Sequence, residues 1–215
     1  RLRSGVQGVA TTCQFEPRVE ESFSGHDAAP FLRRLFVKHG APLFLKRDNG
    51  SNFNTPEVNA LLADFGVIPL NSPVRYPPYN GAIEHGIGEL KRDLAGDASG
   101  TAPQDPCPAL AFARFLVHRH NYFPRRLLDD QSATQAYFQR PRLHWTRRER
   151  HQIFAWIGAR AKCMLCAMDH PGRRHRRRAW RRAVESWLRR QGLISVRQNQ
   201  NQKVSTNFLE NWSHN

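Results

Sequence analysis

The segment Leu43-Phe44-Leu45-Lys46-Arg47-Asp48-Asn49-Gly50-Ser51-Asn52-Phe53 decides how the first half of this chain is organised. Its first four residues predict a short strand, and Asp48 follows at the point where that strand would end. Thr55 can cap a helix that has Pro56 at its first position. We therefore expect a strand, a loop that holds an aspartate, and a helix, in this order.

Strands and helices alternate on both sides of this segment. Upstream, four apolar residues share one face of a predicted helix that Gly40 stops: Phe31, Leu32, Leu35 and Phe36. Downstream, Val67 to Leu70 predicts a second buried strand, and a helix begins again at Gly81 after a proline-rich loop. The alternation predicts an α/β layer structure, with one carboxylate at a strand end and another, Glu84, on a facing helix.

The motifs around Asp48 and Glu84 are specific in both composition and spacing. Residues 47–53 are Arg-Asp-Asn-Gly-Ser-Asn-Phe, residues 78–84 are Pro-Tyr-Asn-Gly-Ala-Ile-Glu, and 35 residues (positions 49 to 83) separate the two carboxylates. With Asn71-Ser72-Pro73, they resemble the Asp-Asn-Gly and Asn-Gly-x-x-Glu signatures of the integrase core in the retroviral-integrase and DDE-transposase superfamily. Further stretches are similar to the tail of that core: Asn121-Tyr122-Phe123-Pro124, Leu127, Ser132-Ala133-Thr134 and Ala136-Tyr137.

The resemblance implies a DNA transposase or integrase with an RNase H-like fold, a mixed sheet flanked by helices. Asp48 and Glu84 would be catalytic carboxylates that ligate Mg²⁺ or Mn²⁺, ions that prefer oxygen ligands. Two such ions activate the attacking oxygen and stabilise the leaving one while mobile-element DNA ends are cleaved and joined to target DNA. The implied partners are double-stranded DNA and further copies of the chain. The residues expected to contact DNA are Asn49, Gly50, Ser51, Asn80, Gly81, Lys91 and Arg92.

The family pattern also requires a third carboxylate, on the first strand and upstream of Asp48. Arg1 to Gly8 resembles the segment just after that strand, so we expect the strand and its aspartate before residue 1 and the printed chain alone to be inactive. Asp27 is too close to Asp48 and is predicted to cap a helix. By themselves, an Asp-Asn-Gly triplet is ordinarily a turn and a helical glutamate is ordinarily solvated. The alternative is a truncated, non-catalytic relative that binds DNA or a partner subunit.

The charge of the chain indicates a polyanionic partner. Its 33 basic and 18 acidic residues give a formal net charge of +15, which favours binding to phosphates. An apolar fraction of 40% can fill a core, and no apolar run approaches the length of a membrane span. The 4 cysteines are spread unevenly and no signal-peptide pattern is present, so we expect a reducing compartment. Together with the resemblance, this predicts a cytoplasmic bacterial protein associated with the nucleoid.

Beyond Pro141 the alternation stops and arginine-rich helical segments begin, so we predict two domains, residues 1–141 and 142–215. Positions 173 to 190 predict an amphipathic helix with a basic outer face and this apolar stripe: Trp180, Ala183, Val184, Trp187 and Leu188. Two apolar stretches after it could pair as a hairpin: Leu193 to Val196 and Val204 to Phe208. This basic α+β appendage either docks on DNA phosphates or has an ordinary structural role.

Cys163 and Cys166, followed by His170 and His175, form the pattern C-x2-C-x3-H-x4-H, which contains zinc-ligand residue types. The gap between the cysteine pair and the histidine pair is far shorter than in an ordinary zinc finger. We therefore interpret these residues as two buried helical cysteines and two solvated histidines, with zinc binding as the alternative.

Overall fold

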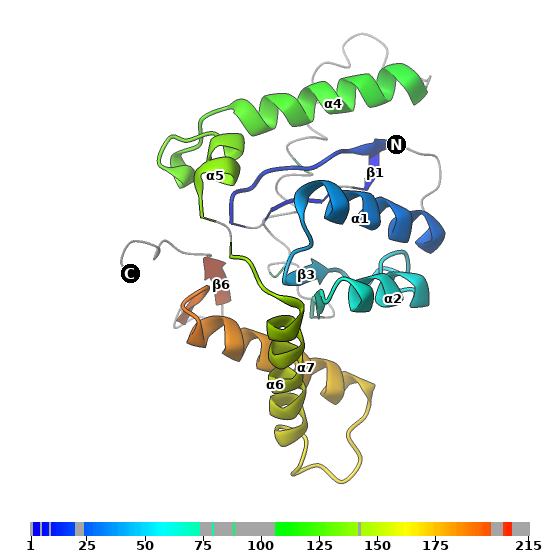
Figure 1. Ribbon diagram of the computed structural model, residues 1–215, viewed down its shortest axis with the longest axis vertical. Coiled ribbons are helices and arrows are strands. Elements are labelled where there is room, and N and C mark those ends of the chain that lie inside the picture. Colours follow the sequence, from blue (N-terminus) through cyan, green and yellow to red (C-terminus); the bar gives the residue numbers. More distant parts are fainter. Residues whose placement is uncertain are drawn as a thin grey trace. The chain divides into compact units, whose positions relative to one another are not determined.

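The computed structural model has a mixed α/β fold (Figure 1). It describes residues 2–4, 6–8, 10–19, 24–73, 79, 88, 106–141, 143–198 and 204–207. The chain divides into two compact units, each built from two stretches of sequence. The first unit joins Arg1–Ser24 to Asn80–Leu143, and the second joins Gly25–Tyr79 to His144–Asn215. In the described part of the chain, no helix is both long and apolar enough to span a membrane.

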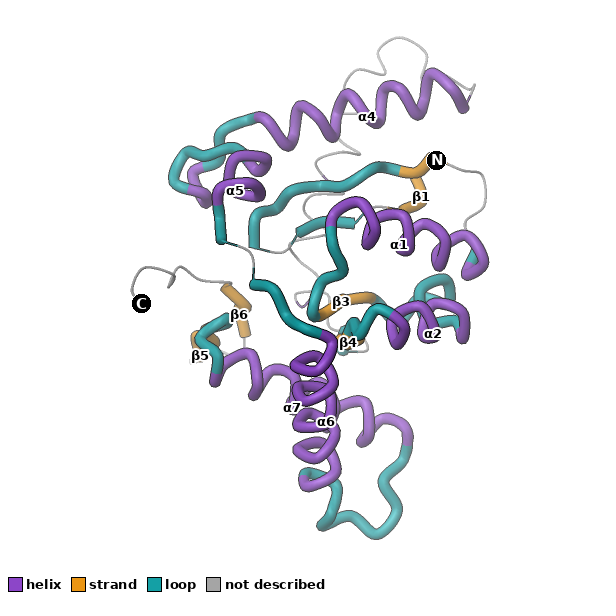
Figure 2. Tube along the Cα trace, viewed as in Figure 1, coloured by secondary structure: helices purple, strands orange, loops and turns teal. Residues whose placement is uncertain are grey.

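A parallel pair of strands lies at the centre of the second unit (Figure 2). Strand β3 (Phe44–Arg47) pairs with β4 (Ile68–Asn71), and Phe44 stands opposite Ile68. Both strands were predicted, and each begins and ends one residue later than expected. The side chains of Ile68 and Leu70 are buried on the same face of β4, as the two-residue period of a strand requires.

Helices α1 (Gly25–His39) and α2 (Pro56–Asp64) pack against each other in the same unit. The predicted cap of α2 is confirmed, because the Thr55 side chain accepts a hydrogen bond from the Val58 amide at 3.3 Å. Glycines follow both helices with positive φ, 85° at Gly40 and 62° at Gly66, a backbone conformation that favours glycine. The apolar face predicted for α1 is also confirmed, since all four of its predicted residues are buried.

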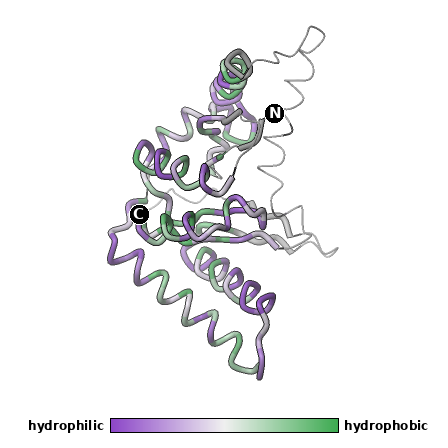
Figure 3. The backbone as a smooth tube through the Cα atoms, turned by 90° about the vertical axis from the view of Figure 1, so that its right-hand side faces the viewer, coloured by the Kyte–Doolittle hydropathy of each residue, from purple (hydrophilic) through white to green (hydrophobic). Residues whose placement is uncertain are grey.

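The two C-terminal helices, α6 (Arg147–Cys163) and α7 (Arg173–Arg190), belong to the core of the second unit. Apolar residues of both helices, and Ile194 after them, pack with Ile68 and Leu70 in one buried cluster; the helical members are Ile153, Ile157, Ala161, Ala179, Ala183, Val184, Trp187 and Leu188. In Figure 3, the two helices at the lower end of the molecule carry hydrophobic and hydrophilic residues in turn, as expected of helices with one buried face. The amphipathic helix is thus confirmed, and it covers the β3–β4 pair.

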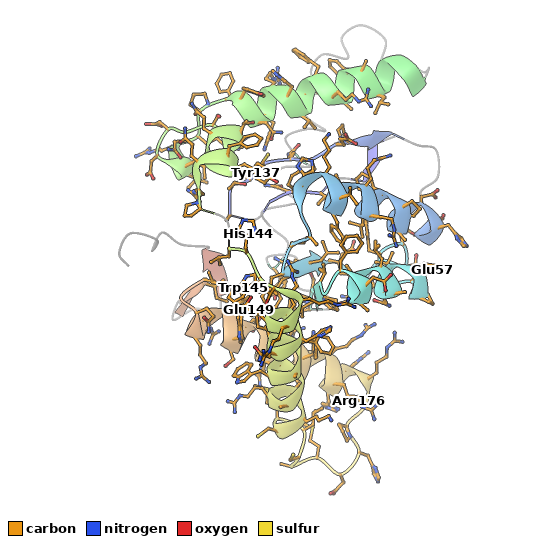
Figure 4. All side chains as sticks on the ribbon, viewed as in Figure 1. Glu57, Tyr137, His144, Trp145, Glu149 and Arg176 are labelled. Atoms are coloured by element: carbon orange, nitrogen blue, oxygen red, sulfur yellow. The ribbon has the colours of Figure 1, made fainter. Side chains whose placement is uncertain are left out.

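A hairpin and two caps complete this C-terminal region. Strands β5 (Ser195–Gln198) and β6 (Val204–Asn207) pair antiparallel, so the predicted hairpin forms with shifted bounds. Helix α6 begins with a capping box between Thr146 and Glu149, the second of which is labelled in Figure 4. Because residues 144–215 share a unit with residues 25–79, the structure does not separate them from the α/β segment. The division at residue 141 stays a prediction.

The first unit is held together around the turn at residues 8–13. Strand β1 (Leu2–Ser4) pairs antiparallel with β2 (Arg18–Val19). The Asn121 side chain, near the end of α4 (Pro106–Tyr122), bonds both backbone groups of Gln14, at 2.9 and 2.7 Å. After a short 3-10 helix, η3 (Arg126–Leu128), helix α5 (Ala133–Gln139) begins with a capping box. Four buried side chains form the small core of this region: Cys13, Leu128, Ala133 and Ala136.

The strands described here form three two-stranded sheets, one of them parallel. This arrangement is consistent with an integrase-like fold, while the single RNase H-like sheet stays a prediction. Of the helix predicted from Gly81, the structure describes Gly88, which is helical, while Glu84 lies outside the described residues.

Candidate active site

Asp48 lies directly after β3, in an exposed loop. The amide of Gly50 donates a hydrogen bond to its Oδ1 at 3.0 Å. A Cβ added at Gly50 would lie 3.0 Å from that oxygen and 3.3 Å from Oδ2, closer than real Cβ atoms normally come. Gly50 therefore lets the backbone approach the carboxylate and orient it. The structure thus assigns Gly50 a local role, next to the DNA contact that the sequence predicts.

Side-chain amides hold the loop around Asp48 in one conformation. Asn54 donates to the carbonyls of Asp48 at 3.0 Å and Gly50 at 2.6 Å. Asn71, at the end of β4, donates to the Asn54 oxygen at 2.5 Å. Asn49 donates to the carbonyl of Ser72 at 2.8 Å, which joins the loop to the segment after β4. Because each amide satisfies a backbone carbonyl or another amide, the position of Asp48 is set by several hydrogen bonds.

Arg47 also stabilises the loop around Asp48. Its guanidinium donates to the Asn71 Oδ1 at 3.2 Å, the Phe53 carbonyl at 2.5 Å and the Asn59 Oδ1 at 2.8 Å. Burial is the main reason why the pKa of Arg47 is lowered, and the positive charge of Arg177 lowers it further. Sequence reasoning treated Arg47 only as part of a motif and did not assign a role to Asn54. The signal was available, since buried amides and arginines beside a turn need hydrogen-bond partners.

Tyr79 is the described residue that leads into the second motif, and it is fixed on β3. The ammonium of Lys46 lies 4.2 Å from the centre of its ring and also bonds its carbonyl. Its hydroxyl donates to Oε1 of Glu185, on α7, at 3.1 Å. Burial, followed by the nearby Glu185 carboxylate, raises the pKa of Tyr79. Tyr79 therefore stays a neutral hydrogen-bond donor. Its contacts with Lys46 anchor this point of the chain on β3, two residues before Asp48 in the sequence.

The structure describes only part of the predicted site. Asp48 and the three residues that follow it, Asn49, Gly50 and Ser51, lie together in one exposed loop. Its partner Glu84 and the remaining predicted DNA contacts lie outside the described residues: Asn80, Gly81, Lys91 and Arg92. The pairing of the two carboxylates therefore stays a prediction.

The C-terminal cysteines and histidines do not form a metal site among the described residues, which include all four. Cys163 is the last residue of α6, Cys166 follows in the next turn, and both are free and exposed. The expectation that these cysteines are buried is therefore wrong. For Cys163 the reason is its place on the helix: it follows the buried Ala161 by two residues, about 200° around α6, and so lies on the side away from the core. His170 and His175 are exposed, as expected.

The donor atoms of Asp48 suit the metal ion that the family resemblance implies. It is an exposed carboxylate whose Oδ1 is oriented by an amide, and carboxylate oxygens suit Mg²⁺ or Mn²⁺. No group of three potential ligands is found among the described residues. Within the described chain, Asp48 is thus the residue of the predicted pair that could hold the ion.

Comparisons with known proteins show a likeness of fold. No family model matches the chain. A chain in the structure of the simian T-cell lymphotropic virus intasome, in complex with PP2A regulatory subunit B56 gamma, superimposes with a TM-score of 0.52 at 18% sequence identity. The match covers 63% of this chain and 47% of that chain.

One sequence relative is an uncharacterized protein of Caenorhabditis elegans. It is 26% identical over 132 residues, which are 61% of this chain and 10% of the worm protein. The chain thus spans less than half of the intasome chain and a tenth of the worm protein. The similarity to the chain in the intasome structure is therefore one of fold.

Proposed function

We propose that this protein is a DNA transposase or integrase, a polynucleotidyl transferase that cleaves mobile-element DNA ends and joins them to target DNA. The observation that carries the proposal is the local geometry of the Asp48 loop and of Tyr79, the described residue of the second motif. Asp48 is held at the end of a parallel strand by a network of amides, and Tyr79, at the start of the second motif, is anchored on the neighbouring Lys46. The fold likeness to an intasome chain supports the same function.

The family resemblance pairs Glu84 with Asp48, because its two signatures supply carboxylates to one metal site. The shared role of these two residues is therefore proposed from the motifs and their spacing.

Asp48 and Glu84 would hold Mg²⁺ or Mn²⁺, and these ions would supply the activation of the attacking oxygen and the neutralisation of the leaving one. The chain's own contribution is to position the Asp48 carboxylate through Gly50 and Asn54 before any ligand binds. Such preorganisation lowers the cost of reaching the reactive geometry.

Double-stranded DNA is the proposed substrate, and copies of this chain are the proposed partners. The net charge of +15 favours a phosphate backbone, and the exposed loop residues Asn49, Gly50 and Ser51 lie beside Asp48. Asn80, Gly81, Lys91 and Arg92 are proposed to contact the same DNA on the basis of the family resemblance.

The test is a strand-transfer assay with labelled transposon-end DNA and Mg²⁺, using a form of the protein extended upstream to include the first-strand aspartate that the family resemblance leads us to expect. Asp48→Asn and Glu84→Gln should each abolish joining. Asp64→Asn is the matched control, because Asp64 is an exposed carboxylate at the end of α2. Joining by Asp48→Asn at the rate of the control would refute the site. An extended form that binds DNA but joins nothing would support the non-catalytic alternative.

A further inference from the structure

Helix α7 runs antiparallel to β3 and β4, and contacts along its length define its register. The Trp187 ring lies 5.5 Å from the ring of Phe44, the first residue of β3. Seven residues earlier in α7, the Trp180 indole donates to the carbonyl of Pro69 at 2.8 Å. Earlier still, Arg177 is close enough to Arg47, the last residue of β3, to lower its pKa. Residues nearer the N-terminus of α7 therefore lie opposite the residues of β3 that are nearer to Asp48.

The first turns of α7 therefore extend past the strand ends, at the edge of the sheet where Asp48 lies. The alternation of side chains along β3 also indicates that Asp48 lies on the side of the sheet that α7 covers. Phe44 contacts Trp187, and Lys46 contacts Tyr79, which bonds α7 through Glu185. Asp48 is the next position in that alternation. The beginning of α7 and Asp48 are thus neighbours within one compact unit.

Three arginines occupy this overhanging part of the helix: Arg173, Arg176 and Arg177. They precede Trp180 by seven, four and three residues, so they share its side of the helix. Trp180 is partly covered by the sheet, whereas Arg173 and Arg176 are exposed because the sheet has ended. Arg176 is labelled on this part of α7 in Figure 4. We call Arg173, Arg176 and Arg177 the arginine ledge.

The like charges of the ledge favour an anionic ligand. The first turn of α7 contains no acidic residue, and Glu185, its one carboxylate, lies two turns away beside Arg181 and Tyr79. Arg177 and Arg47 repel each other, and a bound anion would remove that repulsion. Guanidinium groups on one face recognise phosphates through paired hydrogen bonds.

We infer that the arginine ledge binds the DNA backbone next to the phosphate that reacts at Asp48. This inference rests on the proposed function, because it takes the substrate of that site as its ligand. Phosphates that flank a scissile bond are the anions nearest to the metal site, and holding them fixes the register of the DNA at Asp48. The ledge is therefore a positioning surface built from the C-terminal helix.

The chain offers a matched control on the same helix. Arg174, Arg178 and Arg182 are exposed and recur every four residues on the outer face of α7, away from the sheet. The test compares the triple change Arg173→Gln, Arg176→Gln and Arg177→Gln with the same change at the outer three. Both variants lose the same charge, so a difference between them reports position.

Binding of the full chain to a labelled DNA duplex would be followed by fluorescence anisotropy over a range of NaCl concentrations, without divalent metal. The ledge variant should lower the salt slope by about 2 to 3, because each lost phosphate contact lowers it by about 0.9. The outer variant should lower it by about 1 or less. Equal losses in the two variants would overturn the ledge and leave net charge as the explanation.

Two further arms keep the result interpretable. The double change Arg173→Gln and Arg176→Gln involves only exposed side chains, so it should reproduce most of the effect if the triple variant fails to fold. Tighter binding to a single-stranded RNA than to the duplex would overturn DNA as the partner. A ledge effect in DNA binding, together with an extended form that joins no DNA, would refute the proposed function and leave the ledge as a DNA-binding surface without a reacting phosphate beside it.

Discussion

Replacing Arg150 with methionine should uncouple α6 from the β3–β4 pair. The Arg150 guanidinium donates to the carbonyls of Ala41 and Pro42 at 2.7 Å each and to that of Gly66 at 3.3 Å. These carbonyls lie just before β3 and just before β4. One side chain from the C-terminal region therefore joins the segments that lead into both strands. Burial lowers the pKa of Arg150, in agreement with a partly desolvated cation.

The magnitude follows from the two short bonds. A hydrogen bond from a charged donor contributes about 1.5–3 kcal/mol, and the freed carbonyls near the surface regain water, so we expect a loss of about 3 kcal/mol in unfolding free energy. Methionine keeps the apolar stem that packs on Gly66, so the change removes mainly the guanidinium. At a urea slope of about 2 kcal/mol/M, the unfolding midpoint should fall by about 1.5 M.

The assay is urea unfolding followed by tryptophan fluorescence, because Trp145, Trp180 and Trp187 all pack against the shared core. Arg147→Met is the control, since Arg147 is exposed on the first turn of the same helix and its loss should cost less than about 0.5 kcal/mol. If Arg150→Met matched this control, the C-terminal helices would not stabilise the β3–β4 pair through Arg150, and the reasoning would be refuted.

Three shorter predictions concern other parts of the chain. Gly50→Ala should lower strand transfer at least about tenfold while changing the stability by less than about 1 kcal/mol, since the new Cβ displaces the Asp48 carboxylate on an exposed loop; unchanged activity would contradict the role of Gly50. Ser132→Ala should cost about 1 kcal/mol in thermal unfolding, because it removes the cap of α5; a neutral result would contradict the cap. Burial raises the pKa of the Cys13 thiol, so its thiolate should form and react with Ellman's reagent only at higher pH than an ordinary cysteine; modification at the rate of a free thiol would contradict its burial.

Local signals in the sequence were sufficient for most helix and strand positions in the described chain. Thr55 and Pro56 predicted the start of α2, and glycines predicted the ends of α1 and α2. These signals work because a cap or a positive φ depends on residues only a few positions away. The Asp48 motif was likewise visible in the sequence, because its spacing to Glu84 is a property of the chain alone.

Side-chain partners around the site needed the folded chain. Arg47 bonds Asn71 and Asn59, and Tyr79 bonds Glu185 from the distant α7. Nothing near these residues in the sequence identifies their partners. A buried polar group can pair with any donor or acceptor that the fold places in suitable geometry. Cys163 shows the same limit, since its exposure depends on which face of α6 packs in the core.

The sequence by itself determined the order of strands and helices, the basic character of the chain and the motif around Asp48. Only the tertiary structure decided that α6 and α7 cover the β3–β4 pair, and hence that the start of α7 lies at the edge where Asp48 does. The physical reason is that an apolar stripe specifies only that a face must be buried. Its partner is chosen by the burial and packing of the whole chain, which bring residues far apart in sequence into one core.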